Sequence, residues 1–242
     1  MGDLIDTTEM YLKTVYELEE EGIPALRARI VERLGQSGPT VSETVARLER
    51  DGLLRIGEAR RIKFTAEGLR RAKAVMRRHR LAERLLLDVI KLDWAQVHEE
   101  ACRWEHVLSD DVANRIAKLL EPPFTDPYGN LIPGVTEGDG VPAARTSSDS
   151  VNLWEAVARL EGQIPEEKSH WKVERISERV QAEPEDLRVL DQVGVYPGVS
   201  IRVLEKDGDV VVISATKLAE EPVEQQLELP RVVAEGVCVR PE

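Results

Sequence analysis

The sequence predicts a mainly α-helical protein with a small β component, in the order winged helix-turn-helix, helical middle part and C-terminal β-barrel. Three observations predict this fold class. The first 65 residues contain helix-period segments separated by short turns, and they end in two strand-like segments. Two longer helix-period stretches follow. Beyond a stretch rich in Pro and Gly, apolar residues occur in short runs bounded by turn residues.

The N-terminal part has the element order of a winged helix-turn-helix. We expect helices at about 7–21, 26–34 and 39–51 and strands at about 53–57 and 61–65. Thr7 or Thr8 can cap the first helix, and Gly22 starts the turn that ends it. Pro39 suits the first turn of the third helix, which Gly52 closes. This order favours a winged helix-turn-helix, with a generic small helical bundle as the alternative.

The remaining chain is expected to form a helical part, a linker and a second unit. Helical stretches are expected at 66–91 and 95–120, and the segment from 122 to 149 is typical of loop and linker. Short strands at about 173–180, 200–205 and 210–214, with a hairpin turn at 206–209, suit a small β-barrel, while 153–160 fits either a strand or a helix. The expected domains are 1–73 (winged helix-turn-helix, DNA-binding), 74–140 (helical), 141–150 (linker) and 151–242 (C-terminal).

The charge distribution is compatible with nucleic-acid binding although the net charge is −12. Residues 1–80 carry 16 Lys and Arg against 13 Asp and Glu, or +3, whereas 81–242 carry 17 against 32, or −15. Binding to DNA depends on the local field, because charges beyond ~8–10 Å are screened. A mildly basic N-terminal part on an acidic body therefore permits a DNA partner.

The cysteine count and hydropathy point to a cytoplasmic protein. The two cysteines, Cys102 and Cys238, do not form a disulfide framework, which fits a reducing compartment. No window approaches the ~18 apolar residues of a membrane span, and the N-terminus lacks the features of a secretion signal. We expect no membrane partner.

Six side chains with helical spacing between positions 79 and 106 could bind a metal ion. Residues three and four apart share a helix face, with Cβ atoms ~5–6 Å apart, so that two side chains can reach one ion. A single His–Glu pair arises by chance on many helices, and a lone helical cysteine is more often a core residue. The concentration of six favours a transition-metal site, and thiolate and imidazole donors suit Fe(II), Co(II), Ni(II) or Zn(II) rather than Mg or Ca. The six are His79, Glu83, His98, Cys102, Glu105 and His106.

Three long motifs make the chain similar to a known family. They are DTTEMYLKTVYELEEEG, LRARIVERLGQSGPTVSETVARLERDGLL and VMRRHRLAERLLLDVIKLDWAQVHEEACRWEHVLSDDV. They resemble the diphtheria toxin repressor and iron-dependent regulator family, densely over about 1–135 and thinly beyond. The resemblance implies a winged helix-turn-helix, a helical dimerisation domain that holds metal, and a C-terminal domain similar to a Src-homology-3 barrel. It also implies a homodimer that represses iron-uptake and iron-homeostasis genes by binding palindromic operators when Fe(II) is present, with one or two dimers per operator.

The resemblance implies two Fe(II) sites per protomer, which Co(II), Ni(II), Mn(II), Zn(II) or Cd(II) could also occupy. A regulatory site would use a thioether, a thiol, a carboxylate and an imidazole. These ligands would be Met10, Cys102, Glu105 and His106. An ancillary site would combine helical ligands with a Glu and a Gln of the barrel, which the family spaces as E-x-x-Q. Here these would be His79, Glu83, His98, Glu178 and Gln181. His170 has no matching role, and we expect it to be exposed.

The resemblance also implies a DNA-contact set. Ser37 and Pro39 would contact thymine methyl groups, and the remaining members would contact phosphates or, for Glu43, a base. The whole set is Arg27, Ala28, Arg29, Ser37, Pro39, Thr40, Ser42, Glu43, Arg47, Arg50 and Arg60. Glu43 departs from the family's usual Gln, and a carboxylate can only accept a hydrogen bond from a base. Asp126 stands where the family has a Ser beside an anion pocket, so anion capture should be weaker.

Two alternatives to an Fe(II)-dependent repressor are a manganese-responsive regulator of the same family and a zinc enzyme. A manganese-responsive regulator of the same family should prefer nitrogen and oxygen ligands, and Met10 and Cys102 argue against it. A zinc enzyme would use similar donors, but the sequence contains no H-E-x-x-H motif, nucleophile elbow or phosphate-binding glycine loop. We therefore expect no enzymatic activity.

Overall fold

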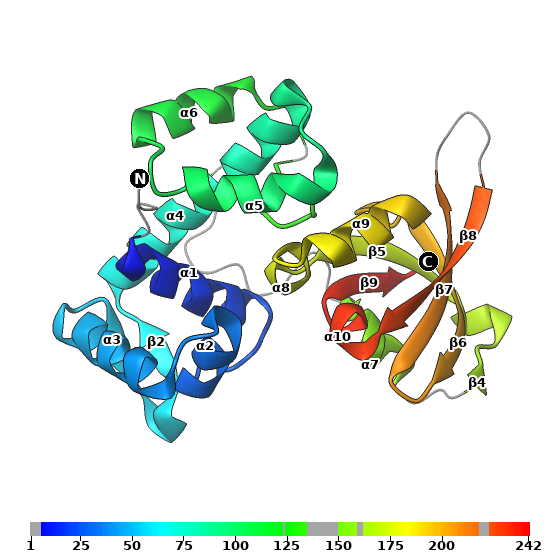
Figure 1. Cartoon of the computed structure of the whole chain (residues 1–242), viewed down its shortest axis with the longest axis horizontal. Helices are drawn as coiled ribbons and strands as arrows, with labels where there is room; N and C mark the ends of the chain where they lie inside the picture. The colour runs from blue at the N-terminus through cyan, green and yellow to red at the C-terminus, as the bar shows by residue number, and fades with distance from the viewer. Residues whose placement is uncertain (1–5, 123, 135–149, 159–161, 218–222) are drawn as a thin grey trace. The chain divides into compact units, whose positions relative to one another are not determined.

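The structure is a computed structural model that describes residues 6–122, 124–134, 150–158, 162–217 and 223–242 (Figure 1). The chain divides into two compact units. Of the described residues, 6–122 without 90–99, together with 124 and 131–134, belong to unit 1, and 90–99, 125–130 and those from 150 onward belong to unit 2. The expected linker 141–150 lies outside the described residues except for Ser150.

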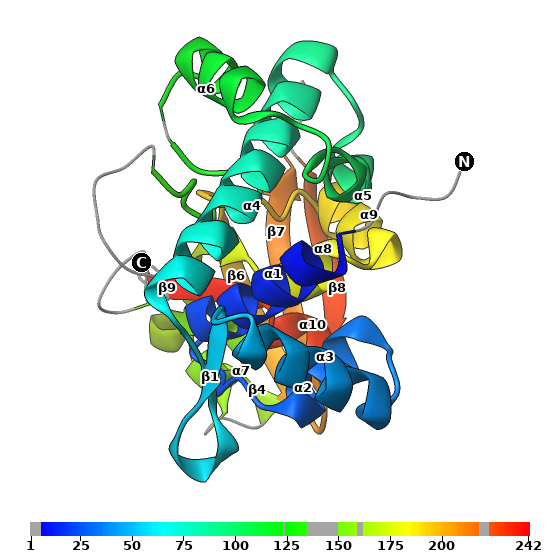
Figure 2. The ribbon, with the colours of Figure 1, turned by 90° about the vertical axis from the view of Figure 1, so that its left-hand side faces the viewer.

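Unit 1 begins with the expected winged helix-turn-helix. Its elements are α1 (Thr7–Glu20), α2 (Arg27–Leu34), α3 (Gly38–Arg50), β1 (Leu54–Ile56) and β2 (Ile62–Phe64). The antiparallel β1–β2 hairpin projects from the three helices (Figure 2). The expected cap of α1 was wrong: neither Thr7 nor Thr8 but Asp6 caps the helix, because Asp6 Oδ1 accepts from the backbone N–H groups of Thr8 (2.8 Å) and Glu9 (3.2 Å). A carboxylate is also favoured at this positive helix end.

A hydrophobic core fixes these elements against the start of the next helix. It includes Tyr11, Leu12, Val15, Tyr16, Leu18, Ile30, Val41, Val45, Leu48, Leu54, Ile62, Ala72 and Met76. The apolar residues of each helix recur three and four positions apart, so each helix buries one face. The DNA-contact residues predicted above are left on the other faces.

Gly68 lies in the first turn of α4 (Ala66–Leu85), directly against the backbone of Leu53. A Cβ at Gly68 would lie 1.8 Å from the carbonyl oxygen of Leu53. We expect Gly68→Ala to lower the free energy of unfolding by about 2–3 kcal/mol, since the backbone must move to relieve the overlap. Urea denaturation measures this change. Gly38→Ala is the control because a Cβ at Gly38 meets nothing within 4 Å. If both variants unfold at the wild-type urea concentration, Gly68 does not lie this close to the backbone of Leu53.

The helical part of unit 1 follows the hairpin. Helix α4 runs from the hairpin past α1 to α6 and continues as a π-helical turn (Leu86–Ile90) (Figure 2). The expected single stretch 95–120 is instead two helices, α5 (Trp94–Trp104) and α6 (Asp110–Leu119). Ser109 causes the restart, because its hydroxyl accepts from the N–H of Val112 (3.3 Å) and caps α6.

Unit 2 contains a seven-stranded antiparallel sheet with strand order β3-β9-β5-β6-β7-β8 and β4 paired to β6. The strands are β3 (Val151–Asn152), β4 (Gly162–Gln163), β5 (His170–Ile176), β6 (Ser200–Asp207), β7 (Val210–Lys217), β8 (Val223–Pro230) and β9 (Val237–Pro241). The helices are α7 (Leu153–Val157), α8 (Glu178–Gln181), α9 (Pro184–Val193) and α10 (Arg231–Ala234). The expected small β domain is confirmed, including the β6–β7 hairpin.

In unit 2 the structure decides one assignment that the sequence left open and corrects the end of one expected strand. The segment that fitted either a strand or a helix contains α7, which Asn152 caps by accepting from the N–H of Glu155 (2.8 Å). The expected strand 173–180 was wrong at its end, because β5 stops at Ile176 and α8 follows. Ser177 is still extended and its N–H donates to the carbonyl of Gly236 (2.8 Å), and α8 begins at the next residue. Among the described helices, none has the length and apolar character that a membrane crossing requires.

Candidate metal centre and DNA-contact surface

A buried donor cluster in unit 1 is centred on His79 of α4. Its Nδ1 lies 2.6 Å from Glu105 Oε2, and its Nε2 lies 2.9 Å from Glu83 Oε1. Glu83 is one helical turn further along α4, and Glu105 follows directly after α5. His79 and Glu83 are fully buried and Glu105 is 3% exposed. Three of the predicted ligands therefore lie together in the interior of unit 1.

The electrostatics of this cluster keep His79 and Glu105 charged. Burial and the charge of Lys13 would lower the pKa of the His79 imidazole, but the carboxylate of Glu83 and the sulfur of Cys102 together raise the pKa well above its ordinary value. Burial would raise the pKa of the Glu105 carboxyl, but the charge of Lys13 and a hydrogen bond from His79 lower the pKa to about 2. A metal ion that binds these groups must displace the imidazole proton.

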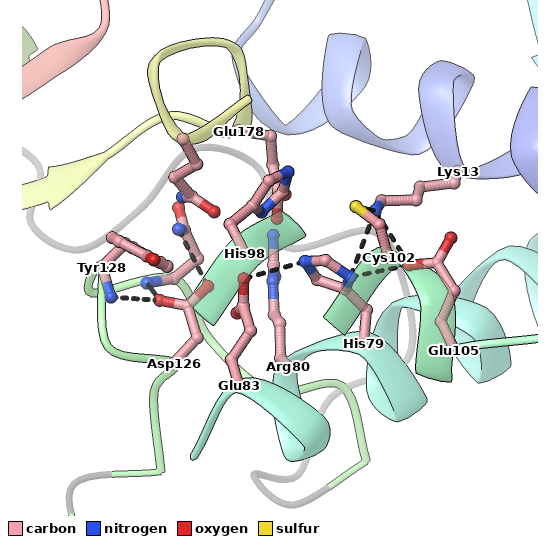
Figure 3. A network of polar contacts seen from close by, with 12 residues as sticks. Lys13, His79, Arg80, Glu83, His98, Cys102, Glu105, Asp126, Tyr128 and Glu178 are labelled. Carbon is pink, nitrogen blue, oxygen red and sulfur yellow. Dashed lines mark hydrogen bonds and ion pairs between the residues drawn. The ribbon is translucent and has the colours of Figure 1, made fainter. Parts of the chain in front are cut away.

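Lys13 of α1 extends into the same cluster, as Figure 3 shows. Its Nζ donates to Glu105 Oε2 (2.9 Å) and to Cys102 Sγ (3.5 Å), and it lies 3.2 Å from His79 Nδ1. The Cys102 thiol, predicted as a ligand, thus belongs to this cluster. Sequence reasoning missed Lys13. The available signal was its position three residues after Met10, on the same side of the first helix.

His106, the fourth predicted donor of this region, has a carboxylate partner from α1. Its Nδ1 lies 2.8 Å from Glu9 Oε2, and Glu9 also pairs with Arg78. The hydrogen bond to Glu9 raises the pKa of His106, which burial only partly offsets. Met10, the neighbour of Glu9, is partly buried and packs against the hydrophobic core of the winged helix-turn-helix. Glu9 and Arg78 were not found from the sequence.

A second group of predicted ligands lies within unit 2. His98 Nδ1 is 3.6 Å from Glu178 Oε2. Gln181, one turn later on α8, is 1% exposed; its Nε2 donates to the carbonyl of Ile176 (2.7 Å), while its Oε1 is buried and accepts no hydrogen bond from the described part of the chain. A buried amide oxygen of this kind is costly unless something coordinates it. Helix α5 carries both His98 and Cys102, four residues apart.

The Asp126 loop is organised by its own carboxylate. Asp126 is 3% exposed, and its carboxylate accepts from the backbone N–H groups of Tyr128 (2.8 Å) and Asn130 (2.9 Å) and from Asn130 Nδ2 (3.0 Å). The N–H groups that this loop could offer to an anion therefore donate to the carboxylate of Asp126 instead.

His170, for which the resemblance implied no role, is exposed, as expected.

The predicted DNA-contact residues lie at the surface of the winged helix-turn-helix. Nine of the eleven are exposed, and Arg27 and Arg47 are half-buried. Ser37 caps α3 by accepting from the N–H of Thr40 (3.3 Å), so the first turn of α3 and its cap are presented together. Arg60 lies at the tip of the hairpin with φ of +59°. A non-glycine residue in this conformation is uncommon and is often found at functional positions.

The fold and the site together define a class of protein: metal-responsive transcriptional regulators that bind DNA through a winged helix-turn-helix. The chain belongs to the iron-dependent repressor family. Residues 3–60 match the family model described as "Iron dependent repressor, N-terminal DNA binding domain", and residues 65–134 match "Iron dependent repressor, metal binding and dimerisation domain". The resemblance found in the sequence motifs is confirmed.

Curated relatives and solved structures agree with this family. The iron-dependent repressor IdeR of Mycobacterium leprae is 46% identical over 241 residues, which covers 99% of both chains. The diphtheria toxin repressor of Corynebacterium jeikeium is 51% identical over 203 residues, or 82% of this chain and 85% of that one. The similarity thus extends further than the N-terminal motifs indicated. A solved structure of a manganese-dependent transcriptional repressor in complex with manganese, 28% identical, superposes with a TM-score of 0.75 over 98% of this chain and 100% of that one.

Proposed function

We propose that the chain is an Fe(II)-dependent, homodimeric, cytoplasmic transcriptional repressor that binds palindromic operator DNA when its metal sites are filled. The observation that supports this most strongly is the cluster of the partly buried Cys102 with the buried Glu105 and His79, in contact with α1, a helix of the DNA-binding domain. Its dimerisation and DNA-binding domains imply a homodimer and a DNA partner. We propose no enzymatic activity, in line with the family.

The chemistry of the donor sets fits a soft divalent ion. We propose that the regulatory ion is held by Met10, Cys102, Glu105 and His106, since a thioether and a thiolate favour Fe(II)-like ions. The second ion would use the set that the sequence predicts, His79, Glu83, His98, Glu178 and Gln181. The buried amide oxygen of Gln181 supports its place in that set. The ions would supply Lewis-acid charge that neutralises the carboxylates and thiolate around them.

The arrangement of unit 1 connects this site to the DNA-binding domain. Met10 lies on α1 and Cys102 on α5, so a ligand set that includes both restrains α1 relative to α5. Two recognition helices of a dimer must lie about 34 Å apart to enter successive major grooves. Metal binding therefore selects a DNA-competent position of the winged helix-turn-helix. Couplings of this type are about 1–3 kcal/mol, or 5- to 150-fold.

Operator selection from random duplex DNA tests the proposed function. The protein is incubated with the DNA pool and Fe(II), and in parallel with a chelator, and bound sequences are recovered. We expect a palindromic site to be recovered only with Fe(II). The base identity selected opposite Glu43 shows which base donates a hydrogen bond to that carboxylate. Equal recovery in both conditions would contradict metal dependence. A lower activation midpoint for Mn(II) than for Fe(II) would favour the manganese-responsive alternative, which the manganese-dependent structural relative keeps open.

Arg50 tests the proposed phosphate contacts. It is exposed in the last turn of α3. We expect Arg50→Ala to weaken DNA binding similarly for all sequences and to reduce the slope of log K against log salt by about 0.9 per binding protomer. Fluorescence anisotropy at several salt concentrations measures both quantities. Arg115→Ala removes a charge of α6 that is also exposed and should leave the slope unchanged; a change of equal size in both variants would argue against a contact at Arg50.

A further inference from the structure

The ammonium group of Lys13 occupies a position that is typical of a bound cation. A carboxylate oxygen of Glu105 and the sulfur of Cys102 lie 2.9 and 3.5 Å from its Nζ. The Lys13 side chain points from α1 into this group (Figure 3), and the residue is only 7% exposed. Its neighbour Glu17 places a further carboxylate oxygen 4.0 Å from Nζ.

Such a lysine is stable only while it is paired. A buried ammonium is strongly disfavoured unless carboxylate or other acceptors surround it. The same holds for Glu105, which is 3% exposed and depends on cationic neighbours. Lys13 therefore neutralises two side chains that a divalent ion would also need as ligands. The ammonium of Lys13 and a metal ion cannot bind Glu105 Oε2 and the Cys102 sulfur at the same time.

We propose that Lys13 is an internal competitor of the metal ion: its ammonium holds Glu105 and Cys102 until a divalent cation displaces it, and so it sets the metal concentration at which the protein responds. This inference rests on the proposed metal site. A divalent ion replaces one positive charge by two, which favours exchange among anionic donors. Because Lys13 and Met10 are three residues apart on α1, withdrawal of the lysine and approach of the thioether both involve the same helix.

Lys13→Gln tests the competition, with Lys118→Gln as the matched control. Both variants lose one positive charge, but Lys118 is exposed on α6. Co(II) is titrated into each protein, and the thiolate-to-cobalt charge-transfer absorption reports binding at Cys102. We expect Lys13→Gln to bind Co(II) on the order of 10- to 100-fold more tightly than the wild type, since no charge-assisted hydrogen bond must be broken. Lys118→Gln should match the wild type. Equal Co(II) midpoints in all three proteins would overturn the competition.

Thermal unfolding gives the same comparison an independent readout. Without metal, Lys13→Gln should melt below the wild type, because Glu105 remains buried without its ammonium partner. With saturating Co(II) this deficit should disappear. A variant that is equally destabilised with and without Co(II) would identify Lys13 as a structural residue only, and would overturn the proposal.

The wild-type protein supplies a test that does not depend on a folded variant. Limited acetylation with acetic anhydride, followed by mass spectrometry, measures the reactivity of Lys13 relative to Lys118. We expect Lys13 to react slowly in metal-free protein and at least several-fold faster once Co(II) saturates the thiolate absorption. No increase at saturation would overturn the competition alone. Absence of any thiolate absorption would overturn the metal site, and the competition with it.

Discussion

Replacing Cys102 with serine is expected to abolish metal-dependent DNA binding while the fold is retained. The Cys102 thiol lies in the donor cluster beside Lys13 and Glu105, and a serine hydroxyl is a poor ligand for a soft ion. Residues that only orient a ligand change metal affinity 10- to 100-fold, so loss of the thiolate itself should exceed about 100-fold. Titration of Co(II) against operator binding, followed by fluorescence anisotropy, measures the loss.

The second cysteine of the chain provides the matched control for Cys102→Ser. Cys238 lies on β9 of unit 2, paired in register with Asn152, and is 8% exposed. Cys238→Ser makes the same chemical change in a strand, outside both predicted ligand sets. It should retain the wild-type Co(II) midpoint. If Cys102→Ser also retains it, the thiol is not a ligand of the regulatory ion.

Replacing Arg80 with methionine is expected to destabilise unit 1 by about 3–5 kcal/mol, the cost of breaking a buried ion pair. Arg80 is fully buried on α4, and its two terminal nitrogens bind the carboxylate of Glu20 on α1 at 3.0 and 2.5 Å. One of these nitrogens also donates to the carbonyl of Leu131 (2.7 Å). Removal of the guanidinium leaves a buried carboxylate and a carbonyl without this donor. Chemical denaturation followed by circular dichroism measures the effect.

A double variant separates the ion pair from simple loss of packing. Glu20→Leu in the Arg80→Met background removes the carboxylate that the first substitution leaves behind. We expect the double variant to recover most of the lost stability, because replacing both partners by apolar groups of similar volume is often nearly neutral. Losses that add without recovery would show that Glu20 and Arg80 are not coupled.

Element order and helix faces could be predicted because local patterns determine them. The spacing of apolar residues located the helices of unit 1, and Pro39 located the start of α3. Boundaries were wrong where a single side chain decides them. Asp6 rather than a threonine caps α1, and Ser109 divides a stretch that is otherwise continuously helical. In unit 2, the short helix α8 follows a strand without a change in apolar spacing that could have predicted it.

The candidate ligands between positions 79 and 106 could be predicted because they recur three and four residues apart along α4 and along and just after α5, whereas Met10, Glu178 and Gln181 were predicted only from the family resemblance. Their partners could not, since buried charge pairs join residues that are distant in the sequence. Lys13 meets Glu105 across 92 positions, and Glu9 meets His106 across 97. A lysine or glutamate in an amphipathic helix is usually on the solvated face, so the pattern gave no reason to place either inside. The requirement that buried carboxylates be paired is a consequence of the fold.

The coupling between the donor cluster and the DNA-binding domain is tested most directly by its reciprocal form. The Co(II) affinity of the wild-type protein is measured by the thiolate-to-cobalt absorption, once alone and once with saturating operator DNA at the same salt concentration. Linkage requires that a metal which promotes DNA binding also binds more tightly to the DNA complex. We expect the Co(II) dissociation constant to fall by about 5- to 150-fold with operator present. The same dissociation constant with and without DNA would contradict metal control of DNA binding.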